Sequence, residues 1–185
     1  MKRLNYKNIT LEQLAAIISK KLQEHGIDSI LVGGGCVSIY SQNRYQSYDL
    51  GYVTYEDMKK VEKALNELNF SKIGRHFEHK DCQYYIEFVA PPVAIGSEPI
   101  LEYEYHMTPL GTIKMLTPTD SVKDRLASYY HWDDYQGLEQ AINICQEIQN
   151  KIDFKEIKKW SKKEGQLKKY DVFLNRLKNI SNEKF

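Results

Sequence analysis

The stretch LVGGGCVSIYSQNRYQSYDLGYV, residues 31–53, decides the fold. An apolar strand is expected at residues 28–32, and it leads directly into three glycines, Gly33–Gly35. A short helix is expected at residues 36–41, and a second strand then carries Asp49. This order predicts a turn that holds phosphate, facing a carboxylate that binds metal.

The three glycines lack side chains, so their backbone N–H groups can approach phosphate oxygens closely. The start of the following helix adds a favourable dipole. The sequence matches neither the G-x-x-x-x-G-K-[ST] pattern nor the G-x-G-x-x-G pattern, which excludes both of those phosphate-binding loops. Taken alone, the glycines are equally consistent with a tight strand-to-helix turn that binds nothing.

Successive side chains of a strand point to opposite faces, so Asp49 and residue 51 share one face. Two acids at these positions would bring two carboxylates together, but the second position is Gly51. Glu87 lies in a later, otherwise apolar strand and is the candidate for a further acid. The alternative is that Glu87 is an edge-strand acid that reaches solvent or pairs with Lys72 or Arg75.

Together, these features resemble the nucleotidyltransferase signature of the DNA polymerase β superfamily. That signature is an apolar strand, Gly-Gly or Gly-Ser, a spacer, then Asp-x-Asp or Asp-x-Glu, with a third acid on a later strand. The segment LTPTDSVKDRLASYYHWDDYQGLEQA, residues 116–141, is also similar to the helix after the core sheet in small bacterial nucleotidyltransferases. Those proteins include the abortive-infection and toxin–antitoxin types, and the resemblance covers residues 10–145.

The resemblance implies an α+β fold, in which a mixed β-sheet nucleotidyltransferase core flanked by helices is followed by a C-terminal helical bundle. It implies transfer of a nucleoside monophosphate from an NTP to a hydroxyl of RNA, protein or a small molecule, with Mg²⁺ or Mn²⁺. Asp49 and Glu87 would be catalytic residues and metal ligands. The nucleotide would be held by Gly33, Gly34, Gly35 and Ser38.

Two cations are further candidates for binding the nucleotide. Lys123 matches a lysine that superfamily members often place near the triphosphate, and Arg44 lies in the loop before Asp49. The alternatives are a solvent-facing helical lysine and an ordinary loop cation.

Gly51 departs from the family pattern and leaves the acid cluster one charge short. Three explanations compete. In the first, the natural protein is a catalytically silent nucleotide-binding or partner-binding module, such as an antitoxin or regulatory subunit. In the second, this copy carries a deliberate substitution. In the third, another acid, such as Glu56 or Asp57, reaches the site. The sequence does not choose among them, and enzyme activity therefore stays an open question.

The remaining pattern divides the chain into an α/β core, residues 1–116, and a C-terminal helical domain, residues 117–185. Thr10 and Gln13 have the spacing of a capping box, and Thr117 with Pro118 is a clear helix start. Further elements are expected as a helix capped by Thr54, strands near 70–78 and 83–89 with a turn at HKD, a strand at 101–106, a strand at 113–116, and helices at 118–131, 134–149, 153–163 and 166–180.

Composition indicates an ordinary soluble protein of 185 residues, with 42% apolar and 28% charged residues. The sequence has no apolar run long enough to span a membrane and no N-terminal signal core, and its three cysteines are widely spaced. These features favour location in a reducing cytoplasm. Residues 151–185 carry 11 Lys and Arg against 5 Asp and Glu. This excess is either a solvated helical face or a basic surface for nucleic acid or an acidic partner.

Overall fold

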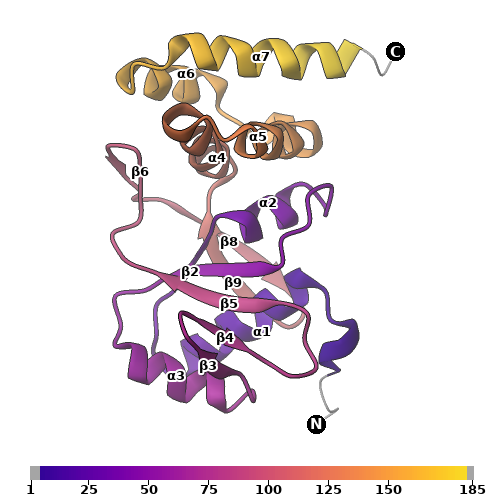
Figure 1. The fold of residues 1–185 in the computed structure, drawn as a ribbon, viewed down its shortest axis with the longest axis vertical. Coiled ribbons are helices and arrows are strands. Elements are labelled where there is room, and N and C mark those ends of the chain that lie inside the picture. Colours follow the sequence, from indigo (N-terminus) through magenta and orange to yellow (C-terminus); the bar gives the residue numbers. More distant parts are fainter. Residues whose placement is uncertain (1–4, 183–185) are drawn as a thin grey trace.

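A computed structural model describes residues 5–182, and a seven-stranded mixed sheet lies at its centre (Figure 1). The strand order is β3-β4-β5-β2-β1-β9-β8. The sheet strands are β1 (Ile30–Val32), β2 (Asp49–Val53), β3 (Ser71–Ile73), β4 (His76–Glu78), β5 (Tyr85–Val89), β8 (Tyr103–Thr108) and β9 (Gly111–Leu116). A separate two-stranded hairpin is formed by β6 (Ala94–Ile95) and β7 (Glu98–Pro99).

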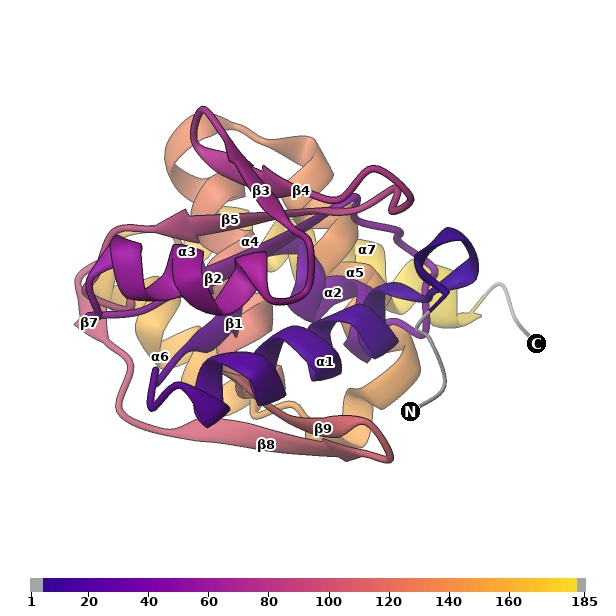
Figure 2. The same cartoon turned by 90° about the horizontal axis from the view of Figure 1, so that it is seen from below.

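Helices cover both faces of the sheet. Helices α1 (Leu11–Glu24) and α3 (Met58–Asn66) lie against one face, seen from below in Figure 2. Helix α2 (Gly34–Tyr40) and the C-terminal helices lie on the opposite side. The observed α+β architecture confirms the fold class expected from the sequence.

Strands β2 and β5 form a parallel pair in the middle of the sheet. Strand β1 pairs antiparallel with β2 on one side and parallel with β9 on the other. The register sets Gly51 opposite Glu87 on β5 and opposite Val32 on β1. These three neighbouring positions therefore share one face of the sheet.

The helix starts expected from capping residues are observed. Thr10 accepts a hydrogen bond from the Gln13 backbone, and the Gln13 side chain accepts one from the Thr10 backbone, which completes the capping box. Thr117 caps α4 through the Asp120 backbone, with Pro118 at the first helical position. Local side-chain contacts thus set the chain direction where each of these two helices begins.

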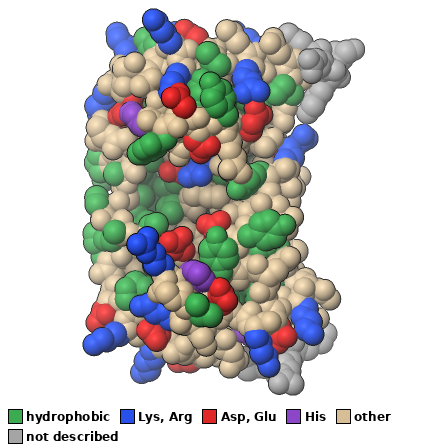
Figure 3. Space-filling model, viewed as in Figure 1, with side chains coloured by type: hydrophobic (Ala, Val, Ile, Leu, Met, Phe, Trp, Pro, Cys, Tyr) green, Lys and Arg blue, Asp and Glu red, His purple; other side chains and the backbone are tan. Residues whose placement is uncertain are grey.

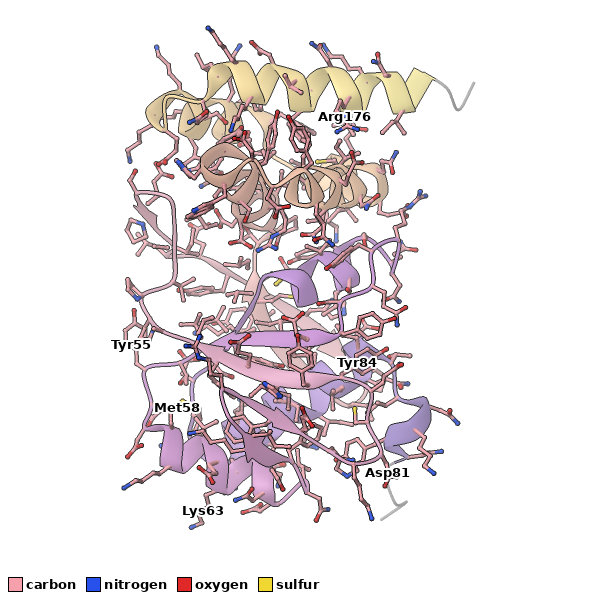
Figure 4. All side chains as sticks on the ribbon, viewed as in Figure 1. Tyr55, Met58, Lys63, Asp81, Tyr84 and Arg176 are labelled. Atoms are coloured by element: carbon pink, nitrogen blue, oxygen red, sulfur yellow. The ribbon has the colours of Figure 1, made fainter. Side chains whose placement is uncertain are left out.

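All elements described after Leu116 are helical, in a layered arrangement with α6 and α7 over α4 and α5 (Figure 1). Tyr130 stacks on Trp160 with ring centroids 5.3 Å apart, which joins the two layers. Figure 4 shows Arg176 extending from α7, where its guanidinium contacts Glu139 of α5 at 2.7 Å. The helices are α4 (Pro118–Trp132), α5 (Tyr135–Ile148), α6 (Phe154–Lys163) and α7 (Leu167–Asn182), and short 3-10 turns occur at η1 (Tyr6–Asn8) and η2 (Gln149–Lys151). A domain boundary at residue 116 stays a prediction.

The expected start of α3 was wrong. The Thr54 hydroxyl donates to the Asp28 carbonyl at 2.7 Å and accepts from the Glu56 backbone at 3.2 Å, but the helix begins only at Met58, so Thr54 does not cap it. Asp57 does so instead, by accepting a hydrogen bond from the Lys59 backbone at 2.9 Å. Within α3, Lys63 points away from the sheet (Figure 4), as an amphipathic helix requires.

The single strand expected near residues 70–78 was also wrong. Gly74 has a φ of +61°, and the chain reverses there to form the β3–β4 hairpin. A left-handed residue inside the expected strand ends its extended conformation. The hairpin of β6 and β7 was not predicted from the sequence.

No helix in the described part of the chain combines the length and the apolar character needed to cross a membrane. Two short ranges lie outside the described part of the chain. Residues 1–4 belong to the stretch that was expected to lack a signal core, and residues 183–185 were counted in the basic C-terminal segment.

Candidate active site

Asp49 and Glu87 lie on the same face of the sheet. Asp49 pairs in register with Tyr85, and Gly51 pairs with Glu87, across the parallel strands β2 and β5. Because register partners in a sheet point the same way, both carboxylates project from one surface. Both also line one pocket of about 380 Å³ between the sheet and the C-terminal helices.

The hydroxyl of Tyr85 lies within the electrostatic influence of both acids. Burial raises the pKa of Tyr85, and the negative charges of Asp49 and Glu87 raise that pKa further. The two carboxylates therefore act on the same small region of the sheet surface.

A short hydrogen-bond relay orients Asp49. The Ser47 hydroxyl donates to Asp49 Oδ1 at 2.7 Å, and the Ser47 backbone N–H donates to the Ser38 hydroxyl at 2.8 Å. Ser38 is almost fully buried and does not line the pocket. The structure thus places Ser38 behind the site, where it supports the loop that carries Asp49.

The glycine turn meets the pocket through its first two residues. Gly33, with a φ of +65°, and Gly34 line the pocket, whereas Gly35 packs into the core. A Cβ atom at Gly34 would lie 2.6 Å from the Ser47 hydroxyl oxygen, and one at Gly35 would lie 3.1 Å from Leu31. Gly34 and Gly35 therefore allow close packing, while Gly33 supplies the left-handed turn.

Arg125 on α4 is the cation that faces this turn. One guanidinium nitrogen would lie 3.8 Å from a Cβ atom built at Gly33, and Arg125 lines the pocket. Arg125 donates to the Asp124 carboxylate and, at 3.2 Å, to Gln140 Oε1. Burial alone would lower the pKa of Arg125, but the charge of Asp124 and its hydrogen bond, with smaller contributions from Cys36 and Tyr45, together outweigh burial and raise the pKa, so the side chain stays cationic.

The sequence interpretation missed Arg125 and selected its neighbour two residues earlier. A usable signal exists, because Arg125 follows the buried Val122 by three residues and precedes the buried Tyr129 by four. Helical spacing of three or four residues places these side chains on one inward face.

Lys123 and Arg44 are not brought to the pocket. The Lys123 side chain is 3% exposed, and its ammonium lies 3.1–3.3 Å from Asp120, Glu156 and Glu98. Arg44 forms an ion pair with Glu147 of α5. Both cations are already paired with carboxylates away from the pocket lining.

Neither acid suggested as a replacement for residue 51 lines the pocket. Glu56 pairs with Lys60 at 3.1 Å, and Asp57 caps α3. Position 51 itself has room for a side chain. A Cβ atom there would meet the Val32 carbonyl oxygen at 3.6 Å, which is an ordinary van der Waals contact.

The donor set fits one divalent cation better than two. Magnesium is commonly held by one or two carboxylates together with substrate phosphates. Asp49 and Glu87 match that pattern, but the described residues contain no group of three or more His, Cys, Asp or Glu side chains able to hold a metal. A paired-metal centre lacks its third carboxylate because of Gly51.

Apart from Asp124, which lines the pocket beside Arg125, the rest of the pocket is apolar, and Figure 3 shows the hollow between the two halves with hydrophobic side chains inside it. Part of this wall comes from residues 93–99, here called the strap, which contains the β6–β7 hairpin. The apolar lining residues are Val32, Val53, Val89, Ala90, Pro92, Val93, Ala94, Ile95 and Leu116.

Polar contacts hold the strap to the C-terminal helices. The backbone N–H and the hydroxyl of Ser97 both donate to Glu164 Oε1, at 3.1 and 2.8 Å. Glu98 accepts from Lys163 at 3.0 Å and from Lys123 at 3.3 Å. Lys123 therefore helps to hold the strap, which forms part of the pocket wall, and does not line the pocket itself.

No protein-family model matches the sequence, and no curated protein matches it either. Solved structures do match. An antigenic nucleotidyltransferase-like protein from Paracoccidioides brasiliensis superposes with a TM-score of 0.54 and 13% identity, covering 74% of this chain and 75% of its own.

The antibiotic-resistance factor ANT(2'')-Ia is similar over a longer range. Its solution structure gives a TM-score of 0.52 with 10% identity, covering 94% of this chain and 97% of that protein. Its crystal structure in complex with adenylyl-2''-tobramycin gives 0.51 with 9% identity, covering 92% and 98%. These likenesses confirm that the chain has a nucleotidyltransferase fold.

Proposed function

We propose that this chain binds a nucleoside triphosphate in the pocket beneath the glycine turn and belongs functionally to the nucleotidyltransferases. The observation that carries this proposal is that Asp49, Glu87, Gly33, Gly34 and Arg125 line one pocket in a nucleotidyltransferase fold. Two carboxylates, an exposed turn and one guanidinium suit a metal-bound triphosphate.

In this proposal Gly33 and Gly34 let the triphosphate approach the backbone, and Arg125 contacts its oxygens. Asp49, oriented by Ser47, and Glu87 would hold Mg²⁺ or Mn²⁺. When bound, the ion would neutralise the phosphate charge. Arg125 would exchange part of its contact with Asp124 for the phosphate, which the shared pocket lining allows.

The transfer reaction would join an acceptor hydroxyl to the α-phosphoryl group and release pyrophosphate. The acceptor would be RNA, a protein or a small molecule. Of these three kinds of acceptor, a small molecule is supported by the structure of ANT(2'')-Ia in complex with adenylyl-2''-tobramycin. The three free cysteines are consistent with the proposed cytoplasmic location.

Gly51 reduces the expected rate of that transfer. Removal of one preorganised hydrogen-bond donor costs about 2.7–4 kcal/mol of transition-state stabilisation in other enzymes, and we expect the missing carboxylate to cost a comparable amount. A catalytically silent nucleotide-binding or partner-binding module, such as an antitoxin or regulatory subunit, is therefore the second candidate. The absence of a three-acid group among the described residues favours it.

Substitution at position 51 separates the two candidates. Wild type, Gly51→Asp and Gly51→Ala would be incubated with α-labelled ATP, Mg²⁺ and either total RNA or cell protein, and incorporated label would be measured. The alanine variant is the matched control, because it adds a Cβ atom without a charge. Circular dichroism would establish that all three proteins are folded.

Incorporation by Gly51→Asp alone indicates an enzyme disabled by one residue, and incorporation by wild type indicates activity with the reduced acid set. ATP binding without incorporation by any variant supports the silent module. If ATP does not bind to folded wild type, as measured by calorimetry, the proposed function is wrong.

A further inference from the structure

The pocket has two chemically different ends along the direction of β2 and β5. Val53 follows Gly51 by two residues, Val89 follows Glu87 by two, and Val53 and Val89 are register partners. Residues two apart lie on the same face about 6.6 Å apart. The surface therefore changes from acidic to apolar within one strand repeat.

The strap forms an apolar wall of this second end. Val93, Ala94 and Ile95 line the pocket together with the two valines of the sheet. Ile95 is 3% exposed, so its side chain is packed and does not project into solvent. Sheet and strap thus supply two apolar surfaces of one space.

We infer that this apolar end is a nucleobase subsite that accepts all four bases with similar affinity. The inference rests on the proposed function, because the triphosphate end of the same pocket is what orients the ligand. A nucleoside triphosphate carries a polyanionic chain at one end and a flat, largely apolar ring at the other. That division matches Arg125 and the glycine turn at one end and Val53, Val89 and the strap at the other.

Base discrimination requires polar groups that pair with the base edge. A site built to hydrogen-bond its ligand rejects an analogue that lacks the group by about 10⁴-fold or more, whereas an apolar pocket discriminates weakly. The residues that line the pocket from Val89 through Ile95 are all apolar. No side chain among them can donate to or accept from a base, so side-chain contact area, and not side-chain hydrogen bonding, holds the ring.

The test is calorimetric titration of the full chain with ATP, GTP, CTP, UTP and inorganic triphosphate, each with Mg²⁺. We expect the four nucleotides to bind within about tenfold of one another and all to bind more tightly than inorganic triphosphate. Val89→Ser should weaken the four nucleotides by a similar factor and leave inorganic triphosphate unchanged. Ile73→Ser is the matched control, because Ile73 is an exposed β-branched residue outside the pocket.

A preference of more than about fiftyfold for one base, or nucleotides that bind no better than inorganic triphosphate, would overturn the inference while leaving the proposed function intact. Failure of both nucleotides and inorganic triphosphate to bind would instead remove the proposed function. The comparison among ligands on wild type needs no variant, so a misfolded Val89→Ser protein does not weaken the test.

Discussion

Gly51 lies directly beside Glu87 across the parallel strands β2 and β5, and both positions face the pocket. A carboxylate introduced at residue 51 would therefore be a cross-strand neighbour of a carboxylate that is already present. Like charges at such positions destabilise a sheet, whereas a shared cation stabilises them.

Gly51→Asp should accordingly make stability depend on magnesium. In the presence of a chelator, we expect Gly51→Asp to lower the free energy of unfolding by up to about 1 kcal/mol relative to Gly51→Ala. Saturating Mg²⁺ should reverse this difference, because the ion binds the folded protein only. Thermal unfolding with and without Mg²⁺ measures the effect. Equal magnesium responses of the two variants would contradict a metal site at Asp49 and Glu87.

A second prediction concerns the stability of the glycine turn, because a Cβ atom at Gly34 would lie 2.6 Å from the Ser47 hydroxyl oxygen. Gly34→Ala should lower the free energy of unfolding by about 1–3 kcal/mol through this overlap. Ser47→Gly removes the obstructing atoms, so the double variant should be more stable than additivity predicts by about 1 kcal/mol. Urea unfolding of the four proteins of this cycle measures the coupling.

Gly33 provides the control for that cycle. Its φ of +65° makes Gly33→Ala costly for backbone reasons alone, and its Cβ atom would approach Arg125 and not Ser47. Ser47→Gly should therefore not relieve the cost of Gly33→Ala. Purely additive effects for the Gly34 and Ser47 pair would show that the turn relaxes without contact between them.

Local signals account for the parts of the fold that the sequence predicted. Thr117 and Pro118 set the start of α4, and the expected C-terminal helices lie within one or two residues of those observed. Strand alternation placed Asp49 and residue 51 on one face, and the observed register adds Glu87, the candidate further acid, to that face. Each of these inferences needed only a spacing of a few residues.

The features that were missed depend on contacts between distant segments. Thr54 and Asp57 are both good capping residues, but Asp57 caps α3, whereas the Thr54 hydroxyl bonds the Asp28 carbonyl of a distant segment. Lys123 and Arg125 are two residues apart on one helix, and the carboxylates around them decide which one reaches the glycine turn. Such choices depend on tertiary packing: helical spacing marks Arg125 as inward-facing, but it does not show which carboxylates surround each cation.

These two cations should respond differently to substitution. Lys123→Met leaves the partly buried Asp120 carboxylate without its lysine partner. We expect the free energy of unfolding to fall by about 2–3 kcal/mol, which is less than the roughly 3–5 kcal/mol expected when a fully buried ion pair loses one partner. Arg125→Lys keeps the charge but loses the paired guanidinium contacts, so the Kd for ATP should rise about tenfold.

Urea unfolding and calorimetric titration of both variants measure this contrast. Lys123→Met, where folded, should leave the Kd for ATP within about threefold of wild type, since Lys123 does not line the pocket. A larger effect of Lys123→Met than of Arg125→Lys on ATP affinity would show that the lysine contacts the triphosphate after all.

The attachment of the strap should depend on the charge of Glu164. Burial alone would raise the pKa of Glu164, but hydrogen bonds from Ser97 and the contact with His131 outweigh it, so the pKa is lower than the ordinary 4.5. A depressed carboxyl pKa means that the stabilising contribution is complete above the unfolded-state pKa and is lost as the pH falls through the lower folded-state value. The strap should therefore remain attached at neutral pH and loosen below about pH 4.5.

Glu164→Gln separates charge from hydrogen bonding, because the amide oxygen can still accept from Ser97. We expect the Ser97 amide of wild type to lose protection from hydrogen exchange, corrected for the intrinsic rate, as the pH falls below about 4.5. In Glu164→Gln the protection should be lower at pH 7 and nearly independent of pH, because no charge remains to be titrated. The Leu31 amide in the central strand β1 serves as the internal reference for global unfolding. A parallel loss of protection at Ser97 and Leu31 would mean that acid unfolds the whole sheet and that Glu164 does not control the strap.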